Sequence, residues 1–237
     1  MMWTIVALVL LALAVFTRIY LNGPDHRKYD DPRGEQFGVG QEPSEAHHGV
    51  VASLSVGTGP IREAPRKEQL RLMREYMDQM SDGLDLASTF TPVDAGGVKA
   101  EWVLAPGADS SRRLLYIHGG AFVMGSPRSH RNITNRFSEI AGCAVLSVDY
   151  RLMPEHSRMA GVEDCRSAYE WLLQNGPDGP SAASKIYIAG DSAGGNLSLM
   201  MSAWTRDHGS RKADAVIALS PVTDMTLGSP SMKSNLE

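Results

Sequence analysis

The sequence predicts an α/β fold, with a mostly parallel sheet that carries helices on both of its faces. The main observation is that, after Ser81, short apolar runs alternate with segments of helical periodicity, and strands that alternate with helices build βαβ units. The second observation is the length of 237 residues, which is enough for one large domain or two small ones. The net charge of −4 supplies no basic surface, so we expect no nucleic-acid partner.

Residues 1–21 predict a membrane-anchoring helix. Residues 1–17 have no charged side chain and Arg18 follows them, which puts the apolar run near the lower limit of about 17–25 residues for a spanning helix. A cleaved signal peptide, leading to secretion, is the alternative, but it requires a basic n-region that this chain lacks. We therefore expect a single-pass N-terminal anchor in the membrane. The side of the membrane on which the body lies stays open.

Residues 22–62 are polar and rich in turn-forming residues, and they predict a linker without a core of its own. The domain proper is expected at residues 63–237, beginning with a helix over residues 63–82. Apolar side chains form one stripe along that helix, at Leu70, Met73, Met77 and Met80. Such a helix either packs on a core or covers a substrate pocket, and we describe it as lid-like.

Five strands and three helices are predicted in the rest of the domain. The strands are expected at residues 98–104, 114–117, 144–148, 186–189 and 215–219. The helices are expected at residues 131–140, 162–173 and 195–206. The last strand is expected to form an apolar sheet edge, which favours aggregation or pairing with another chain. Cys143 and Cys165 lack the spacing of a metal site, so we expect two buried thiols and no metal.

The segment Gly190-Asp191-Ser192-Ala193-Gly194 follows a predicted strand and precedes a predicted helix. It matches the G-x-S-x-G pattern of a nucleophilic serine in the structural context that this pattern requires. Because the backbone is strained at so sharp a turn, the residues two positions away on either side must be small. We assign Ser192 as the catalytic nucleophile and give Asp191 a supporting role. The alternative is a glycine-rich turn that closes an ordinary strand–helix unit.

A second glycine-rich segment, His118-Gly119-Gly120-Ala121, ends an earlier predicted strand. Small residues allow backbone N–H groups to converge on one point, where they can stabilise the oxyanion of acyl transfer by roughly 3–4 kcal/mol each. We expect an oxyanion hole from Gly119, Gly120 and Ala121, completed by Ala193 after the nucleophile. His118 is rejected as the general base and assigned a supporting role, in which it holds the glycine loop by hydrogen bonds.

Three motifs in this order resemble the hormone-sensitive-lipase-like branch of the α/β-hydrolases, which includes bacterial esterases and arylacetamide-deacetylase-like enzymes. The motifs are HGGAF (118–122), VDYRLMPE (148–155) and GDSAGG (190–195), and the resemblance covers roughly residues 64–237. It implies the α/β-hydrolase fold and hydrolysis of carboxyl esters with short or medium acyl groups. It also implies an acyl-enzyme on the serine and no cofactor.

The resemblance has two further implications for individual residues. The family usually has a glycine at the position of Ala121, but alanine keeps the N–H donor, so we expect a change in pocket shape rather than lost chemistry. In the middle motif, a structural network of ion pairs and hydrogen bonds behind the site is expected from Asp149, Tyr150, Arg151 and Glu155.

The sequence shows no histidine in a position to activate Ser192. In α/β-hydrolases the nucleophile is followed by the acid and then by the histidine. The one histidine after Ser192 is His208, at the far end of the predicted helix and roughly 20 Å from the hydroxyl. Asp224 is interpreted as a loop residue. We expect the catalytic acid and histidine, together with further C-terminal strands, beyond residue 237, and we expect the chain as given to be nearly inactive.

Two other functions stay open on the same scaffold. One is a non-catalytic protein that binds a small apolar ligand, and the other is a peptidase or amidase. The intact serine motif favours the esterase, whose partner is a small-molecule ester. The acyl and alcohol specificity and the oligomeric state are left open.

Overall fold

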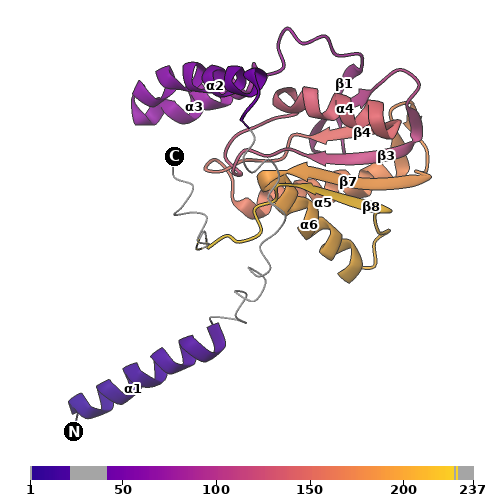
Figure 1. Cartoon of the computed structure of the whole chain (residues 1–237). Helices are drawn as coiled ribbons and strands as arrows, with labels where there is room; N and C mark the ends of the chain where they lie inside the picture. The colour runs from indigo at the N-terminus through magenta and orange to yellow at the C-terminus, as the bar shows by residue number, and fades with distance from the viewer. Residues whose placement is uncertain (1, 22–41, 227, 229–237) are drawn as a thin grey trace. The chain divides into compact units, whose positions relative to one another are not determined.

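Figure 1 shows the computed structural model, which describes residues 2–21, 42–226 and 228. The chain divides into two compact units, residues 1–51 and 52–237. In the first unit, α1 spans Met2–Phe16 and continues as a π-helical segment over Thr17–Leu21. The 18 residues Trp3–Tyr20 have a mean hydropathy of 2.0, and none of them is buried. By length and composition this is the one helix of the described chain suited to cross a membrane, and a signal sequence would have the same properties.

Helix α2 spans Glu45–Glu63, where the sequence predicted a polar linker. The linker prediction gave weight to glycines, which lower helix propensity. One of them, Gly57, lies against the next helix, because a Cβ at this position would stand 2.5 Å from Cε2 of Tyr76. The glycine therefore permits close helix packing rather than a break. The linker prediction is wrong for α2, and residues 22–41 of the predicted linker lie outside the described residues.

Helix α3 spans Arg66–Asp78, inside the helix predicted for residues 63–82. Arg74 ties it to the domain. Its Nε donates to the carbonyl oxygen of Val123 at 2.7 Å, and its two terminal nitrogens each donate to a carboxylate oxygen of Glu155 at 2.9 Å. The helix is thus fastened over the loop that follows the strand of the first glycine motif, and its role as a lid stays a prediction.

A six-stranded sheet forms the centre of the domain, in the order β1-β2-β4-β3-β7-β8. Its strands are β1 (Thr89–Asp94), β2 (Lys99–Leu104), β3 (Asp109–Ile117), β4 (Cys143–Val148), β7 (Lys185–Asp191) and β8 (Ala215–Leu219). Strands β4, β3, β7 and β8 are parallel, whereas β1 and β2 join as antiparallel neighbours. All five predicted strands are present. The sequence analysis missed β1 and the short pair β5 (Asn175–Gly176) and β6 (Gly179–Pro180).

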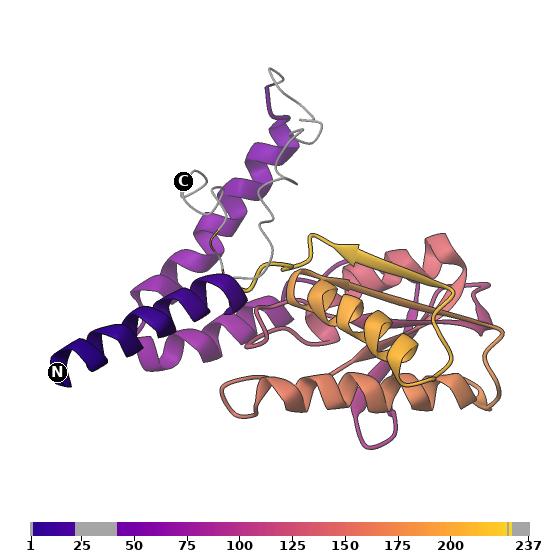
Figure 2. The same ribbon diagram turned by 90° about the horizontal axis from the view of Figure 1, so that it is seen from below.

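Helices cover both faces of the sheet. They are α4 (Arg131–Ala141), α5 (Arg158–Gln174) and α6 (Ser192–Asp207). Helix α4 lies on one face, and α5 and α6 lie on the other, which is the side seen in Figure 2. Alternate residues of β3 follow this division, since Leu114 and Tyr116 pack with α4 whereas Leu115 and Ile117 join the core beneath α5 and α6. The predicted fold, a mostly parallel sheet with helices on both faces, is confirmed.

Two smaller predictions are also confirmed. Cys143 and Cys165 are free thiols, and both are fully buried. Strand β8 has β7 as its one neighbour in the described sheet, and its apolar side chains Ile217 and Leu219 are 41% and 40% exposed. The sheet therefore presents an apolar edge at β8.

Candidate active site

The nucleophile motif forms a sharp turn between β7 and α6. Strand β7 ends at Asp191 and α6 begins at Ser192, whose φ of 51° lies in the left-handed region that L-residues rarely adopt. A Cβ on Gly190 would stand 2.5 Å from the carbonyl oxygens of Ile117 and Gly194. One on Gly194 would stand 1.9 Å from the same Ile117 oxygen. The two glycines are therefore needed because backbone from β3 fills the space where side chains would lie.

The first glycine motif lies beside this turn. Strands β3 and β7 are parallel neighbours in which Ile117 is opposite Gly190, so residues 118–121 leave the sheet next to the turn that carries Ser192. The loop has a positive φ at Gly120, 113°, which glycine adopts without strain, and at Ala121, 54°, where the backbone is strained. The positive φ explains why glycine suits the position of Ala121, since alanine in the left-handed region costs about 1–2 kcal/mol.

Three backbone N–H groups near Ser192 have no acceptor among the residues that the structure describes. Within the described chain, no hydrogen bond leaves the N–H of Gly120 or Ala121. The N–H of Ala193 belongs to the first turn of α6, where the helix itself supplies no acceptor. The positive end of the helix dipole also lies at this turn. These N–H groups are the donors that an oxyanion would require.

Gly119 has a different role from the one expected. Its N–H donates to Oδ1 of Asp191 at 2.9 Å, so this N–H is not available to an oxyanion. The same carboxylate oxygen accepts a hydrogen bond from the hydroxyl of Tyr116 at 2.8 Å. A Cβ on Gly119 would stand 2.1 Å from Oδ2 of Asp191, so only glycine fits against the carboxylate. Asp191 thus joins the nucleophile turn to the glycine loop, which is a supporting position.

His118 is fully buried and its Nδ1 lies 2.8 Å from the carbonyl oxygen of Gly119. Its ring stacks on Tyr150 at 4.3 Å between centroids, and the Tyr150 hydroxyl donates to the His118 carbonyl oxygen at 3.0 Å. Burial, and next the neighbouring His130, lower the pKa of His118 to about 3, so the ring is neutral near pH 7. It holds the loop from inside the core, where it is unsuited to exchange protons with a substrate.

A buried histidine that the sequence analysis missed lies at the same place. His130, 5% exposed, precedes α4 and places its Nε2 3.4 Å from Oδ1 of Asp191. Burial raises the pKa of Asp191, but the contact with His130 and the hydrogen bonds from Tyr116 and Gly119 outweigh it, and the pKa of this carboxyl lies below its ordinary value. Asp191 is therefore ionised near pH 7. A lone histidine far along the chain from the serine motif gave no sequence signal for this contact.

No described histidine reaches the nucleophile. Within the described chain, no hydrogen bond joins the hydroxyl of Ser192 to a histidine, and His130 faces the carboxylate instead. Helix α6 runs from Ser192 to Asp207, so His208 follows its opposite end, where its Nδ1 contacts the carbonyl oxygen of Trp204 at 3.2 Å. The site holds a serine and candidate oxyanion donors, but the described residues supply no general base.

The middle motif lies behind the site, as expected. Arg151 forms a forked ion pair with Asp164 of α5, at 2.9 Å from its Nε and 2.8 Å from a terminal nitrogen. Glu155 is the partner of Arg74, and Tyr150 supports His118. The network is thus present for three of the four residues expected to form it.

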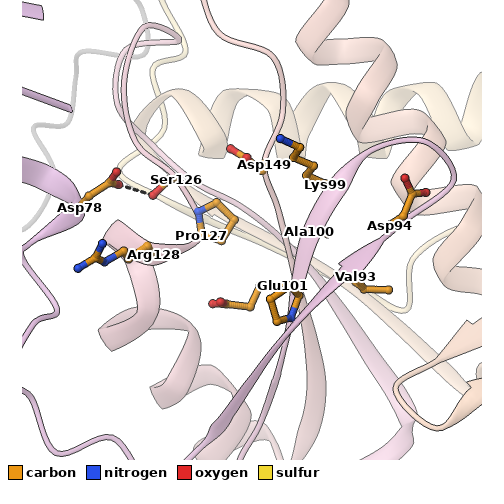
Figure 3. A pocket seen from close by; sticks show the side chains of 11 residues that line it. Asp78, Val93, Asp94, Lys99, Ala100, Glu101, Ser126, Pro127, Arg128 and Asp149 are labelled. Atoms are coloured by element: carbon orange, nitrogen blue, oxygen red, sulfur yellow. Dashed lines mark hydrogen bonds between the residues drawn. The ribbon is translucent and has the colours of Figure 1, made fainter. Parts of the chain in front are cut away.

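The fourth residue, Asp149, lines a separate pocket of about 670 Å³ (Figure 3). Its wall combines Asp78, Asp94, Glu101 and Asp149 with Lys99 and Arg128. Burial raises the pKa of Asp149, and the nearby Lys99 opposes that effect. Neither Ser192 nor the glycine loop lines this pocket. Over the described residues, no group of three or more histidine, cysteine or acidic side chains is arranged to hold a metal ion.

The chain belongs to the α/β hydrolase fold family, whose model matches residues 114–237, just over half of the sequence. Its relatives also confirm the resemblance to the hormone-sensitive-lipase branch. An esterase of known structure from the bacterial hormone-sensitive lipase family is 38% identical, with a TM-score of 0.65 over 78% of this chain and 62% of that one. The structure of EstE5 soaked with p-nitrophenyl butyrate is 36% identical, with a TM-score of 0.63 over 76% and 61% of the two chains.

Curated relatives are esterases and a related hydrolase. The carboxylesterase/phospholipase LipF of Mycobacterium tuberculosis is 42% identical over 142 residues, which are 58% of this chain and 37% of LipF. An acetyl-hydrolase of Streptomyces hygroscopicus is 40% identical over 134 residues, which are 56% of this chain and 43% of that protein. The chain thus spans less than half the length of these curated relatives.

Proposed function

We propose that this chain supplies the nucleophile and the oxyanion hole of a serine carboxylesterase acting on esters with short or medium acyl groups. The observation that carries the proposal is the position of Ser192 at a strained turn next to a glycine loop with unengaged N–H groups. In the proposed reaction the Ser192 hydroxyl attacks the ester carbonyl, and the alcohol leaves as an acyl-enzyme forms. The N–H groups of Gly120, Ala121 and Ala193 bind the oxyanion, and water then releases the acid.

Activity of the chain by itself is expected to be very low, because no residue that the structure describes is placed to take the proton of Ser192. Serine hydrolases that lack members of the triad lose about 10⁴–10⁶ in turnover but keep a residual activity from the oxyanion hole. Hydrolysis of p-nitrophenyl butyrate at a rate of order 1–10³ s⁻¹, which is typical of enzymes, would show that a base is present after all.

Imidazole added to the buffer tests the nucleophile directly, because it can act as the missing base. The rate of p-nitrophenyl butyrate hydrolysis by the intact chain should rise with imidazole above the rate of Ser192→Ala, which reports the direct reaction of imidazole with the ester. The control Ser202→Ala, which changes a serine further along α6, should respond as the unaltered chain does. Equal rates for the unaltered chain and Ser192→Ala at every imidazole concentration would reject the esterase. Saturable binding of the ester in that case would favour a non-catalytic ligand-binding protein.

A further inference from the structure

We propose that His130 is a positioning residue, which holds the Asp191 carboxylate against the N–H of Gly119 and so fixes the glycine loop, residues 118–121, relative to Ser192. As a role in catalysis this rests on the proposed function. The fixing of the loop, however, is a physical property that can be measured without any activity. The argument starts from Asp191, since its Oδ1 alone contacts three groups from other parts of the chain: Gly119, Tyr116 and His130.

The two other contacts of Oδ1 come from one part of the chain, namely β3 and the loop that follows it. Tyr116 is in β3, and Gly119 lies two residues after the end of that strand. His130 comes from the start of α4 and is the contact that joins a different element to the carboxylate. Removing its ring would leave the carboxylate unsupported on that side and the loop free to move with it.

The side chain of His130 is held for this contact, and its ring also packs beside that of His118, at 5.4 Å between centroids. It occupies the N-cap position of α4 but makes no side-chain capping bond, although N-cap residues generally accept one. Its Nδ1 lies 2.7 Å from the hydroxyl of Ser129. That hydroxyl donates to the carbonyl oxygen of Ser126 at 2.8 Å, so its oxygen faces Nδ1, while the other ring nitrogen, Nε2, faces Asp191.

The turn that holds His130 is itself fixed. The N–H of Ser126 donates to the hydroxyl oxygen of Ser129 at 2.8 Å, and the hydroxyl of Ser126 donates to Asp78 at the end of α3. A continuous series of polar contacts therefore runs from α3 through His130 and Asp191 to the glycine loop. This series gives a physical reason for a buried histidine where an apolar side chain would pack at less cost.

Hydrogen–deuterium exchange of the full chain tests the positioning role. His130→Leu should raise the exchange rate of the Gly119 amide, which donates to Asp191, by about tenfold, and His130→Gln, which keeps an N–H donor, should restore most of the protection. Ser129→Ala should produce a smaller change at the same amide, and it keeps the test informative if His130→Leu fails to fold. His208→Leu, which alters an exposed histidine, and Ser184→Ala, at the opposite end of the sheet, serve as controls and should leave this amide unchanged.

The outcomes separate this inference from the proposed function. Unchanged exchange of the Gly119 amide for both His130→Leu and Ser129→Ala would overturn the inference. So would a loss of protection spread evenly over the whole sheet, because that pattern marks general destabilisation. If the exchange changes as expected but imidazole never activates Ser192, the positioning role stands and the esterase proposal fails. If both hold, His130→Leu should lower the imidazole-supported kcat by about tenfold with little change in KM.

Discussion

At the residue scale, the turn that carries Ser192 depends on the absence of side chains at two positions. Gly194→Ala would place a Cβ 1.9 Å from the carbonyl oxygen of Ile117, which is backbone in the middle of the sheet and cannot move aside. We expect a loss of unfolding free energy on the order of 3 kcal/mol or more, measured by denaturant titration. Gly59→Ala is the matched control, since a Cβ in that helix meets nothing within 4 Å, and it should be neutral or stabilising. Equal stability of the two variants would contradict the packing described.

The left-handed backbone of Ser192 leads to a second prediction that does not depend on activity. Both Ser192→Ala and Ser192→Gly remove the hydroxyl, but only glycine adopts a φ of 51° without strain. Ser192→Gly should therefore be more stable than Ser192→Ala by about 1 kcal/mol in the same titration. If the alanine variant proved the more stable, the turn would not hold the strain that its φ indicates.

At the scale of elements, the attachment of α3 should weaken in acid. The hydrogen bond from Arg74 lowers the pKa of Glu155 to about 2. Because the folded pKa is depressed, this ion pair stabilises the protein above the ordinary glutamate pKa of about 4.3, and its contribution is lost as the pH falls toward 2. The unaltered chain should melt at a higher temperature than Glu155→Gln at pH 7, and the difference should shrink between pH 5 and pH 2.5. A difference that stays constant with pH would show that the ionised carboxylate is not what holds the helix.

The exposed strand β8 predicts the behaviour of the domain in solution. Ile217 is 41% exposed on an edge strand and also lines an apolar groove beside Phe137 and Ile140 of α4. A charged side chain at such an edge opposes pairing between chains, so Ile217→Lys should reduce concentration-dependent aggregation, measured by light scattering. Val216→Lys, on the opposite and more buried face of the same strand, is the contrasting variant and should instead destabilise the fold. Aggregation unchanged by Ile217→Lys would place its origin elsewhere in the molecule.

The elements predicted from the sequence are those whose burial is visible as a local pattern of apolar residues. The central strands are buried on both faces, so they appear as continuous apolar runs, and β4 is buried at all six positions. Strand β1 was missed because it contains Pro92, which the edge of a sheet tolerates but which argues against a strand in a sequence pattern. Helix α2 was missed because the reason for its glycine at position 57 lies in α3 rather than in its own sequence.

The same distinction between local pattern and tertiary contact applies to the residues of the candidate site. Ser192, Asp191 and the glycine loop were recognised because each belongs to a contiguous motif with a steric explanation. The contact of His130 with Asp191 and the use of the Gly119 N–H depend on the register of β3 against β7 and on the position of α4. Neither is encoded in local periodicity, so neither could be derived from spacing along the chain.

At the scale of the whole molecule, the function of the N-terminal helix is the remaining question, and we propose that it is an uncleaved membrane anchor. Residues Trp3–Tyr20 form an apolar helix with no buried side chain, so in water it would expose its full apolar surface. The protein should stay with membranes during alkaline carbonate extraction, and intact mass measurement should show residue 1 or 2 at its N-terminus. Leu8→Arg combined with Leu11→Arg should release it, because each arginine at the centre of such a helix costs about 2.5–3.5 kcal/mol on insertion scales. Leu199→Arg, on the exposed surface of α6, is the control and should not release it. A mature protein that starts near residue 15 and appears in the soluble fraction would instead identify the helix as a signal peptide.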